Sequence, residues 1–290
     1  MIKKFTIYGE RCSGTNYIEN LIKLNFNIKI TWEYGWKHFF GFDNLINSDD
    51  TLFICIVRNP VDWMNSLYKY KHHLYSDVYN DPEKFLNSPI ISVTEKIKVV
   101  DEEEVVDEEE VVDEEEVVDE EGEVVDEEEV VDEEGEVVDE EEVVDEEEVV
   151  DEEEVVDKEE VVDEEVVIDN NYIELILDRN IYTKKRYKNI FELRHTKLKY
   201  MVTTLKKTVK NYIIIRYEDL LYDFNNTMKK FNKFKLKKKK NIIFPINEIK
   251  DCKYGGLYNP NKSDFIFTKE TIFENLNFVK TYEKKFGYID

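Results

Sequence analysis

The sequence predicts an α/β fold of three layers, a parallel sheet flanked by helices, with a long acidic low-complexity insert in its middle. Three observations predict it. Short apolar runs alternate with helix-like segments on both sides of the insert. One run, residues 51–57, is continuously apolar, as expected for a strand buried on both faces. The insert is too charged to contribute to a packed core.

The insert repeats the motif Asp-Glu-Glu-Glu-Val-Val from Asp101 to Glu165. These 65 residues hold 42 acidic residues and one lysine, a formal charge of −41, so the rest of the chain carries +14. In a helix, successive Val pairs would rotate by about 240° and form no apolar stripe. In a strand, each pair would put one side chain on each face. We therefore expect residues 99–168 to be a solvated tract, disordered or loosely helical.

The insert divides one predicted domain into residues 1–98 and 169–290, which together suffice for one sizeable core. Two interpretations of the insert stay open. It is either a binding segment for basic proteins or a tolerated expansion in a surface loop, and the low entropic cost of long loops favours the second. The basic remainder suits an anionic ligand such as a nucleotide.

The elements expected before the insert begin with a strand at the N-terminus and end with a helix that starts at a proline. Asn59 and Pro60 have the residue types of a helix N-cap and first helical position. The predicted elements are strands at residues 4–8, 28–32 and 51–57 and helices at residues 16–24 and 61–70.

After the insert, the pattern predicts a long lysine-rich helix, another buried strand and closing helices. Asp219 is expected to cap the helix that runs toward Phe234, and Gly287 to end the last helix. The predicted elements are a helix at residues 190–209, a strand at residues 211–217 and helices within residues 268–286.

Composition limits the class of protein further. The three cysteines, Cys12, Cys55 and Cys252, are widely spaced and suggest neither a metal site nor a disulfide framework, so a reducing compartment fits best. No apolar run approaches the length of a membrane span, and no signal peptide is evident. We expect a cytoplasmic protein without a membrane partner, and a nucleic-acid partner is not expected.

The first candidate site is the turn Gly9-Glu10-Arg11-Cys12-Ser13-Gly14 between the first strand and the first helix. Its two glycines have the spacing of a phosphate-binding loop, in which backbone N–H groups and the helix N-terminus bind an anion. Thr15 and Asn16 stand where the nucleoside-triphosphatase motif has Lys and Ser/Thr. The turn therefore predicts a P-loop-type phosphate cradle without that motif's chemistry. An ordinary glycine turn is the other interpretation.

The second candidate site is the segment Arg58-Asn59-Pro60-Val61-Asp62, with Ser66 eight residues after Arg58. It puts an arginine at the end of a buried strand and a hydroxyl on the following helix. Arginine offers a fork of donors for phosphate. A structural ion pair at the strand end is the other interpretation of Arg58.

The two motifs together resemble the sulfotransferase family, over most of the chain outside the insert. The resemblance implies that the first loop binds the 5′-phosphosulfate of 3′-phosphoadenylyl sulfate and that Arg58 and Ser66 bind its 3′-phosphate. It implies transfer of a sulfuryl group to the hydroxyl or amine of a small-molecule or glycan acceptor, without a metal ion. The predicted donor-binding residues are Arg11, Cys12, Ser13, Gly14, Thr15, Asn16, Arg58 and Ser66.

The family resemblance also suggests a catalytic base. In cytosolic family members, a Lys-x-His segment stands about twenty residues before the Arg-Asn-Pro motif. Here Trp36-Lys37-His38 stands at that position, with Arg58 twenty residues after His38. His38 is therefore the candidate base, because imidazole titrates near neutral pH, and Lys37 is a candidate helper. A surface histidine in an aromatic loop is the other interpretation. The segment Arg216-Tyr217-Glu218-Asp219-Leu220 also resembles the family, and we expect it to be structural.

Two departures from the family pattern bear on activity. Cys12 stands where the family often has a lysine, so Arg11 is expected to supply the positive charge. The adenine-side basic segment near the C-terminus is not evident, and Lys262-Ser263 is a poor substitute. Two other functions therefore stay open: a P-loop small-molecule kinase, and a catalytically inactive nucleotide-binding or scaffold protein that acts through its acidic repeat.

Overall fold

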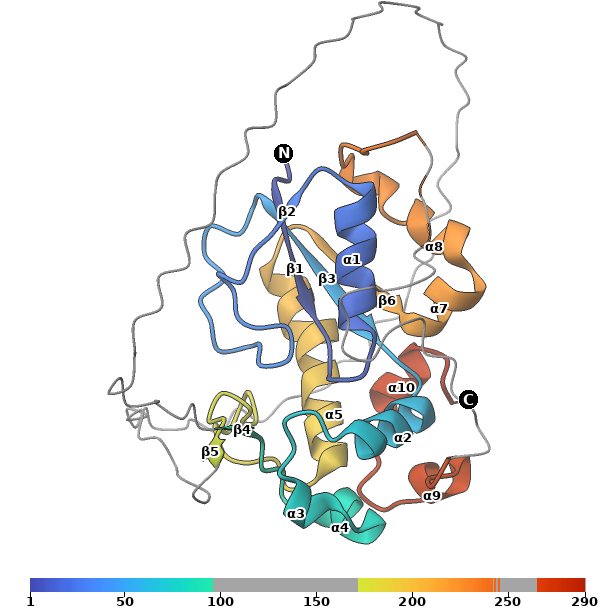
Figure 1. Ribbon diagram of the computed structural model, residues 1–290. Coiled ribbons are helices and arrows are strands. Elements are labelled where there is room, and N and C mark those ends of the chain that lie inside the picture. The colour runs from blue at the N-terminus through green and yellow to red at the C-terminus, as the bar shows by residue number, and fades with distance from the viewer. Residues whose placement is uncertain (96–171, 242, 244, 246–264, 290) are drawn as a thin grey trace, which may run out of the picture. The chain divides into compact units, whose positions relative to one another are not determined.

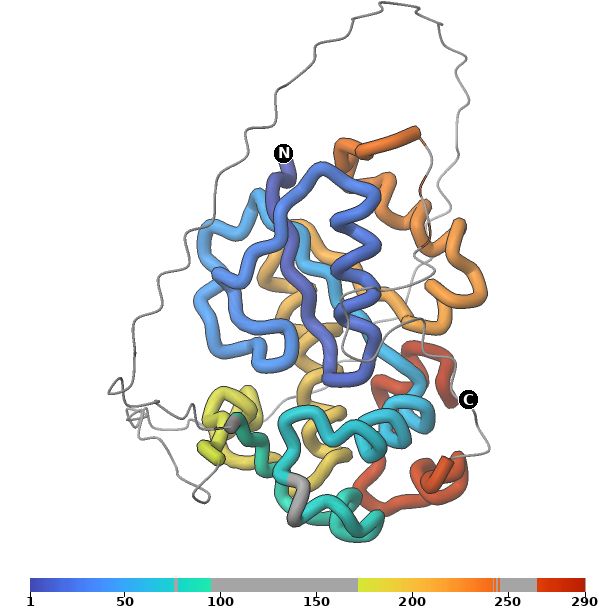
Figure 2. The backbone as a smooth tube through the Cα atoms, viewed as in Figure 1, coloured from blue at the N-terminus to red at the C-terminus, as the bar shows by residue number. Residues whose placement is uncertain are grey.

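The computed structural model describes residues 1–95, 172–241, 243, 245 and 265–289 (Figure 1; Figure 2). The predicted insert, residues 99–168, lies outside the described residues, and so do Cys252, Lys262 and Ser263. The strands contributed by residues before and after the insert pair with each other, so both parts of the chain build one sheet.

The central sheet has four strands in the order β2-β1-β3-β6, and each neighbouring pair is parallel. This confirms the α/β class with a mainly parallel sheet flanked by helices. The predicted first strand agrees with β1, whereas the predicted strand at residues 28–32 is shortened to β2. The chain leaves β2 for a tight turn, closed by a hydrogen bond from the Gly35 N–H to the Trp32 carbonyl (3.2 Å). The strands are β1 (Lys4–Tyr8), β2 (Lys29–Ile30), β3 (Thr51–Val57) and β6 (Tyr212–Arg216).

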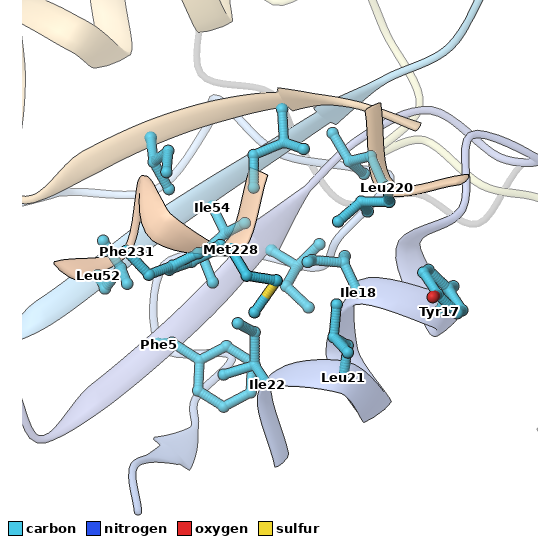
Figure 3. Close-up of a cluster of buried hydrophobic side chains, with 14 of the residues drawn as sticks. Phe5, Tyr17, Ile18, Leu21, Ile22, Leu52, Ile54, Leu220, Met228 and Phe231 are labelled. Carbon is cyan, nitrogen blue, oxygen red and sulfur yellow. The ribbon is translucent and has the colours of Figure 1, made fainter. Parts of the chain in front are cut away.

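One face of the sheet is covered by α1 (Thr15–Asn25), α7 (Tyr217–Tyr222) and α8 (Phe224–Lys229). Alternate strand residues point into this layer, as Figure 3 shows for Phe5, Leu52 and Ile54. The helices contribute apolar side chains at helical spacing. Those labelled in the figure are Tyr17, Ile18, Leu21, Ile22, Leu220, Met228 and Phe231.

The opposite face packs against α5 (Ile190–Lys199) and the π-helical turn η1 (Tyr200–Leu205), which continues into α6 (Lys206–Thr208). The predicted helix at residues 190–209 is therefore confirmed, with one wide turn inside it. Every second residue of β3 points toward this layer. These residues, Phe53, Cys55 and Val57, are all buried. Because both faces of β3 are covered, its residues after Thr51 are all apolar.

A third apolar cluster joins α2 (Pro60–Tyr70) to the start of α5, with α3 (Ser76–Tyr79), α4 (Pro82–Asn87) and α9 (Lys269–Phe273) (Figure 1). Trp63 is fully buried within it. As predicted, Asn59 caps α2, and its side chain accepts hydrogen bonds from the N–H groups of Val61 (2.9 Å) and Asp62 (3.4 Å). A separate antiparallel pair is formed by β4 (Val93–Glu95) and β5 (Tyr172–Glu174).

Two predicted helix ends have different outcomes. The predicted cap at Asp219 is wrong, because α7 begins at Tyr217 and the Asp219 carboxylate pairs instead with the Arg216 guanidinium (2.5 Å). The predicted stop at Gly287 is confirmed. It follows α10 (Thr281–Lys285) with a φ of 66°, a left-handed conformation that favours glycine.

Candidate functional site

The loop from Gly9 to Gly14 connects the end of β1 to the start of α1, where its shape requires both glycines. A Cβ on Gly9 would lie 2.7 Å from the Ile56 carbonyl oxygen on β3. Gly14 has a φ of 94°, and a Cβ there would lie 2.4 Å from the Tyr217 ring. Gly14 makes no side-chain cap at the start of α1. A helix N-terminus that follows a glycine-containing loop is a common location for a bound anion.

Inside this loop, Cys12 adopts a left-handed conformation with a φ of 63°. The Ser13 N–H donates to the Glu10 carbonyl (3.1 Å), and the Ser13 hydroxyl donates to the same oxygen (2.5 Å). The Trp63 indole N–H donates to the Arg11 carbonyl (2.8 Å). The loop is thus held in a tight curve by its own backbone and by α2.

The second motif meets the loop at Cys12. Arg58, at the end of β3, donates from Nη1 to the Cys12 carbonyl (2.8 Å), and Ser66 on α2 lies close enough to the Cys12 thiol to influence its pKa. Burial raises the pKa of this thiol to about 11, while Ser66 and the charges of Arg58 and Arg11 act in the opposite direction. Residues from the two motifs, which are more than forty positions apart in the sequence, are therefore brought together.

Tyr217 lies between the two motifs. Its ring packs over Gly14 and lies 5.2 Å from the Arg58 guanidinium carbon, and it meets Tyr17 of α1 edge-on. Glu218 accepts the Asn59 N–H (2.8 Å) and the Tyr288 hydroxyl (2.9 Å). The segment beginning at Arg216 was expected to be structural, and in this arrangement it fixes the end of β3 beside the loop.

His38 lies directly under the start of the loop. Its Nδ1 is 2.8 Å from the Gly9 carbonyl oxygen, and since that oxygen can only accept, Nδ1 carries the proton. The other ring nitrogen, Nε2, is then the one with a lone pair. Burial lowers the pKa of His38 well below its ordinary value, so the ring is neutral at pH 7. A neutral, oriented imidazole is the form a general base requires.

Lys37 reaches the start of α1 from the same turn. Its carbonyl accepts the Gly9 N–H (3.0 Å), and its ammonium group lies 2.5 Å from the Asn16 side-chain oxygen and 3.6 Å from the Glu19 carboxylate. Asn16 stands where a nucleoside-triphosphatase loop has its Ser or Thr. A lysine from another segment thus brings positive charge to the helix start, and Thr15 beside it is buried.

The Arg11 side chain turns away from the loop into a buried ion-pair cluster. Its guanidinium contacts the Asp178 carboxylate (2.8 Å), the Ser92 hydroxyl (2.9 Å) and the His72 carbonyl (3.3 Å), and it is 1 % exposed. Burial would lower the pKa of Arg11, but Asp178 and Glu10 outweigh it and the pKa is raised. The structure therefore does not bring this guanidinium together with Arg58 and Ser66.

Lys197 of α5 completes the cluster beneath the loop. Its buried ammonium group contacts Glu10 (2.7 Å), Asp178 (2.9 Å) and the His38 carbonyl (2.6 Å). Burial would raise the pKa of Asp178, but Arg11 and Lys197 hold it well below its usual range. The cluster links the loop, the candidate base and the segment after β5.

Arg194, one turn before Lys197 on α5, supports Arg58 from below. It donates from Nη2 to the Arg58 carbonyl (2.8 Å) and pairs with the Glu283 carboxylate through two hydrogen bonds (2.5 and 2.9 Å). A cavity of about 10 Å³, room for about one water molecule, is lined by Arg58, Arg194 and Lys197 among other residues.

The sequence did not single out Asp178, Lys197 or Arg194. Tyr217 and its neighbours carried a signal in the Arg-Tyr-Glu-Asp-Leu run, but the lysine-rich helix gave no sign of which cations are buried. Of the remaining histidines, His195 is half-buried on α5 beside Tyr282, at 5.1 Å between ring centroids, away from the loop. His73 is exposed.

Comparison with models of protein families, with curated proteins and with solved structures finds no match for the chain. Within the described residues, no group of three or more histidine, cysteine, aspartate or glutamate side chains could hold a metal ion. None of the helices in those parts of the chain is both long and apolar enough to cross a membrane.

Proposed function

We propose that the chain is a sulfotransferase with a P-loop-type anion site, which transfers a sulfuryl group from 3′-phosphoadenylyl sulfate to an acceptor hydroxyl or amine. The observation that carries the proposal is the meeting of Arg58 and Ser66 at Cys12, inside the loop between the two glycines. Two motifs recognised separately in the sequence thus meet at one loop, as a shared anion site would require.

The residues around the loop suit a ligand with two separated anionic groups. The amide groups of the loop and of the first turn of α1 would hold the 5′-phosphosulfate, with Lys37 beside them at Asn16. Arg58 and Ser66 would hold the 3′-phosphate. Arg11, which pairs with Asp178, would act by positioning the loop rather than by contacting the donor.

The proposed reaction moves one proton and one sulfuryl group. The acceptor oxygen or nitrogen attacks the sulfur in line, the bond from sulfur to the bridging phosphate oxygen breaks, and adenosine 3′,5′-bisphosphate leaves. Nε2 of His38 takes the acceptor's proton, because Nδ1 is already held by the Gly9 carbonyl. Lys37 and the loop amides stabilise the negative charge on the leaving oxygen.

Replacing Arg58 with alanine is expected to weaken the binding of adenosine 3′,5′-bisphosphate by roughly 1–3 kcal/mol, the range for a lost charged hydrogen bond. Calorimetric titration of the full chain measures this affinity. Ser66→Ala is a milder variant that should weaken binding in the same direction. Arg186→Ala is the matched control, since Arg186 pairs with Glu174 outside the site. Unchanged affinity in both Arg58→Ala and Ser66→Ala would refute the assignment of the 3′-phosphate.

A further inference from the structure

The two motifs of the candidate site are connected twice, and the second connection uses side chains to which the proposed reaction gives no part. The direct connection is the hydrogen bond from Arg58 to the Cys12 carbonyl (2.8 Å). The second connection runs through Trp63 of α2 and Arg194 of α5, and both side chains are buried. It links the loop to the end of β3 by way of two helices.

Trp63 makes the contact with the loop. Its indole N–H donates to the carbonyl of Arg11 (2.8 Å), one residue before Cys12. A buried indole N–H requires an acceptor, and a loop carbonyl that points into the fold requires a donor, so one bond satisfies both groups. The Arg11 guanidinium is held separately by Asp178 (2.8 Å). The position of the loop backbone therefore depends on α2.

Arg194 makes the contact with the end of β3. Its Nη2 donates to the Arg58 carbonyl (2.8 Å), while its Nε and Nη2 bind the two oxygens of the Glu283 carboxylate (2.5 and 2.9 Å). Burial would lower the pKa of Arg194, but Glu283 outweighs it and the pKa is raised, so the guanidinium stays charged. The backbone at Arg58 is thereby fixed to α5 and, through Glu283, to α10.

A cation–π contact joins the two halves of this connection. The guanidinium carbon of Arg194 lies 5.0 Å from the centroid of the Trp63 ring. Such a contact is stronger between buried groups than at an exposed surface. The path from the Arg11 carbonyl through Trp63 and Arg194 ends at the Arg58 carbonyl. It therefore does not depend on the direction in which the Arg58 guanidinium points.

We infer that Trp63 and Arg194 are positioning residues, which couple the loop to the end of β3 and so fix the separation between the two phosphate-binding parts of the site. A ligand with two anionic groups gains from both at once only where the two subsites lie at the matching separation. The pair therefore makes the site selective for a nucleotide that carries both phosphates. This selectivity rests on the proposed function, whereas the coupling itself does not.

The test uses two conservative variants of the full chain and one control. Trp63→Phe removes the indole N–H but keeps an aromatic ring. Arg194→Lys keeps a positive charge beside Glu283 but loses the planar fork of donors. Phe85→Leu is the control, because it removes volume from the apolar cluster that contains Trp63 without altering either contact. It therefore accounts for a general loss of stability.

Calorimetric titration compares adenosine 3′,5′-bisphosphate with the 5′-monophosphate and the 3′-monophosphate of adenosine, each of which has only one of the two groups. Each variant should weaken binding of the bisphosphate about tenfold, the loss of one hydrogen bond, and binding of either monophosphate less than about twofold. The double variant should be no weaker than the weaker single variant, because both residues lie on one path. Equal losses for all three nucleotides, unchanged bisphosphate affinity, or fully additive losses would overturn the inference.

Hydrogen exchange without nucleotide tests the coupling independently of the proposed function. Mass spectrometry follows peptides that cover residues 9–16 and 54–62. Each variant should speed exchange severalfold in both peptides, and Phe85→Leu in neither. A change confined to the peptide that each residue contacts directly, or no change, would overturn the coupling. If the unaltered chain does not bind the bisphosphate, the sulfotransferase proposal and the selectivity are refuted, and exchange alone decides the coupling.

Discussion

Replacing Asp178 with alanine is expected to lower the free energy of unfolding by about 3–5 kcal/mol, because it leaves two buried cations without their shared carboxylate. Asp178 contacts both Arg11 (2.8 Å) and Lys197 (2.9 Å), and its side chain is inaccessible to solvent. Urea unfolding of the full chain, followed by near-ultraviolet circular dichroism, measures the change. The matched control is Asp49→Ala, because Asp49 is 82 % exposed and lies 3.8 Å from Lys210, a surface pair worth little.

The same cluster predicts a loss of stability in acid. The pKa of Asp178 in the folded chain is held below its unfolded value of about 3.9, so its contribution is complete above that pH and is lost as the pH falls further. The unaltered chain should therefore lose more stability between about pH 5 and pH 2 than Asp178→Ala does. Equal acid sensitivity of the two chains, or a cost similar to that of the Asp49 control, would refute this account of the cluster.

Replacing His38 with asparagine is expected to reduce sulfuryl transfer about 100- to 10,000-fold, the usual contribution of a general base. Asparagine can still donate from its side-chain amide to the Gly9 carbonyl, but it has no counterpart of Nε2. Binding of adenosine 3′,5′-bisphosphate should therefore be preserved. Transfer of labelled sulfate from 3′-phosphoadenylyl sulfate to a panel of acceptors that carry hydroxyl or amine groups, with calorimetry in parallel, measures both quantities.

His195→Asn is the matched control, since His195 lies on α5 away from the loop, and it should retain transfer. The pH profile provides a second readout. Because burial keeps the pKa of His38 well below 6.5, transfer should remain near its maximum at pH 6 and decline only in more acidic solution. An active His38→Asn enzyme, or loss of bisphosphate binding in it, would assign another role to this histidine.

Much of the sheet could be predicted from the sequence because its strands carry local signals. The run at residues 51–57 is apolar on both faces, and β3 is in fact buried on both faces. Asn59 and Pro60 start α2 as their residue types predict, since capping depends on only a few neighbouring residues. The cap predicted at Asp219 was wrong because a carboxylate near a helix start can either cap the helix or pair with a cation. In the structure Asp219 pairs with Arg216, three residues earlier in the chain.

The buried charge cluster could not be predicted, for a physical reason. Lys197 lies in a helix with many lysines, and Asp178 follows a tract of many acidic residues, so neither differs locally from a solvated charge. What distinguishes Lys197 and Asp178 is that they form an ion pair with each other in the folded chain. The side chain of Arg11 was expected to contribute to the anion site, but it pairs with Asp178 instead. Lys37, which the sequence suggested only as a helper, is the cation found at the start of α1.

The central claim is that the loop and Arg58 form a site for a nucleotide with a 3′-phosphate. The most direct test is titration of the full chain with adenosine 3′,5′-bisphosphate in the presence of a chelator, compared with titration with ATP and Mg²⁺. The account predicts that the bisphosphate binds without metal and more tightly than ATP with Mg²⁺. Preference for ATP with Mg²⁺, or binding of neither nucleotide, would contradict it.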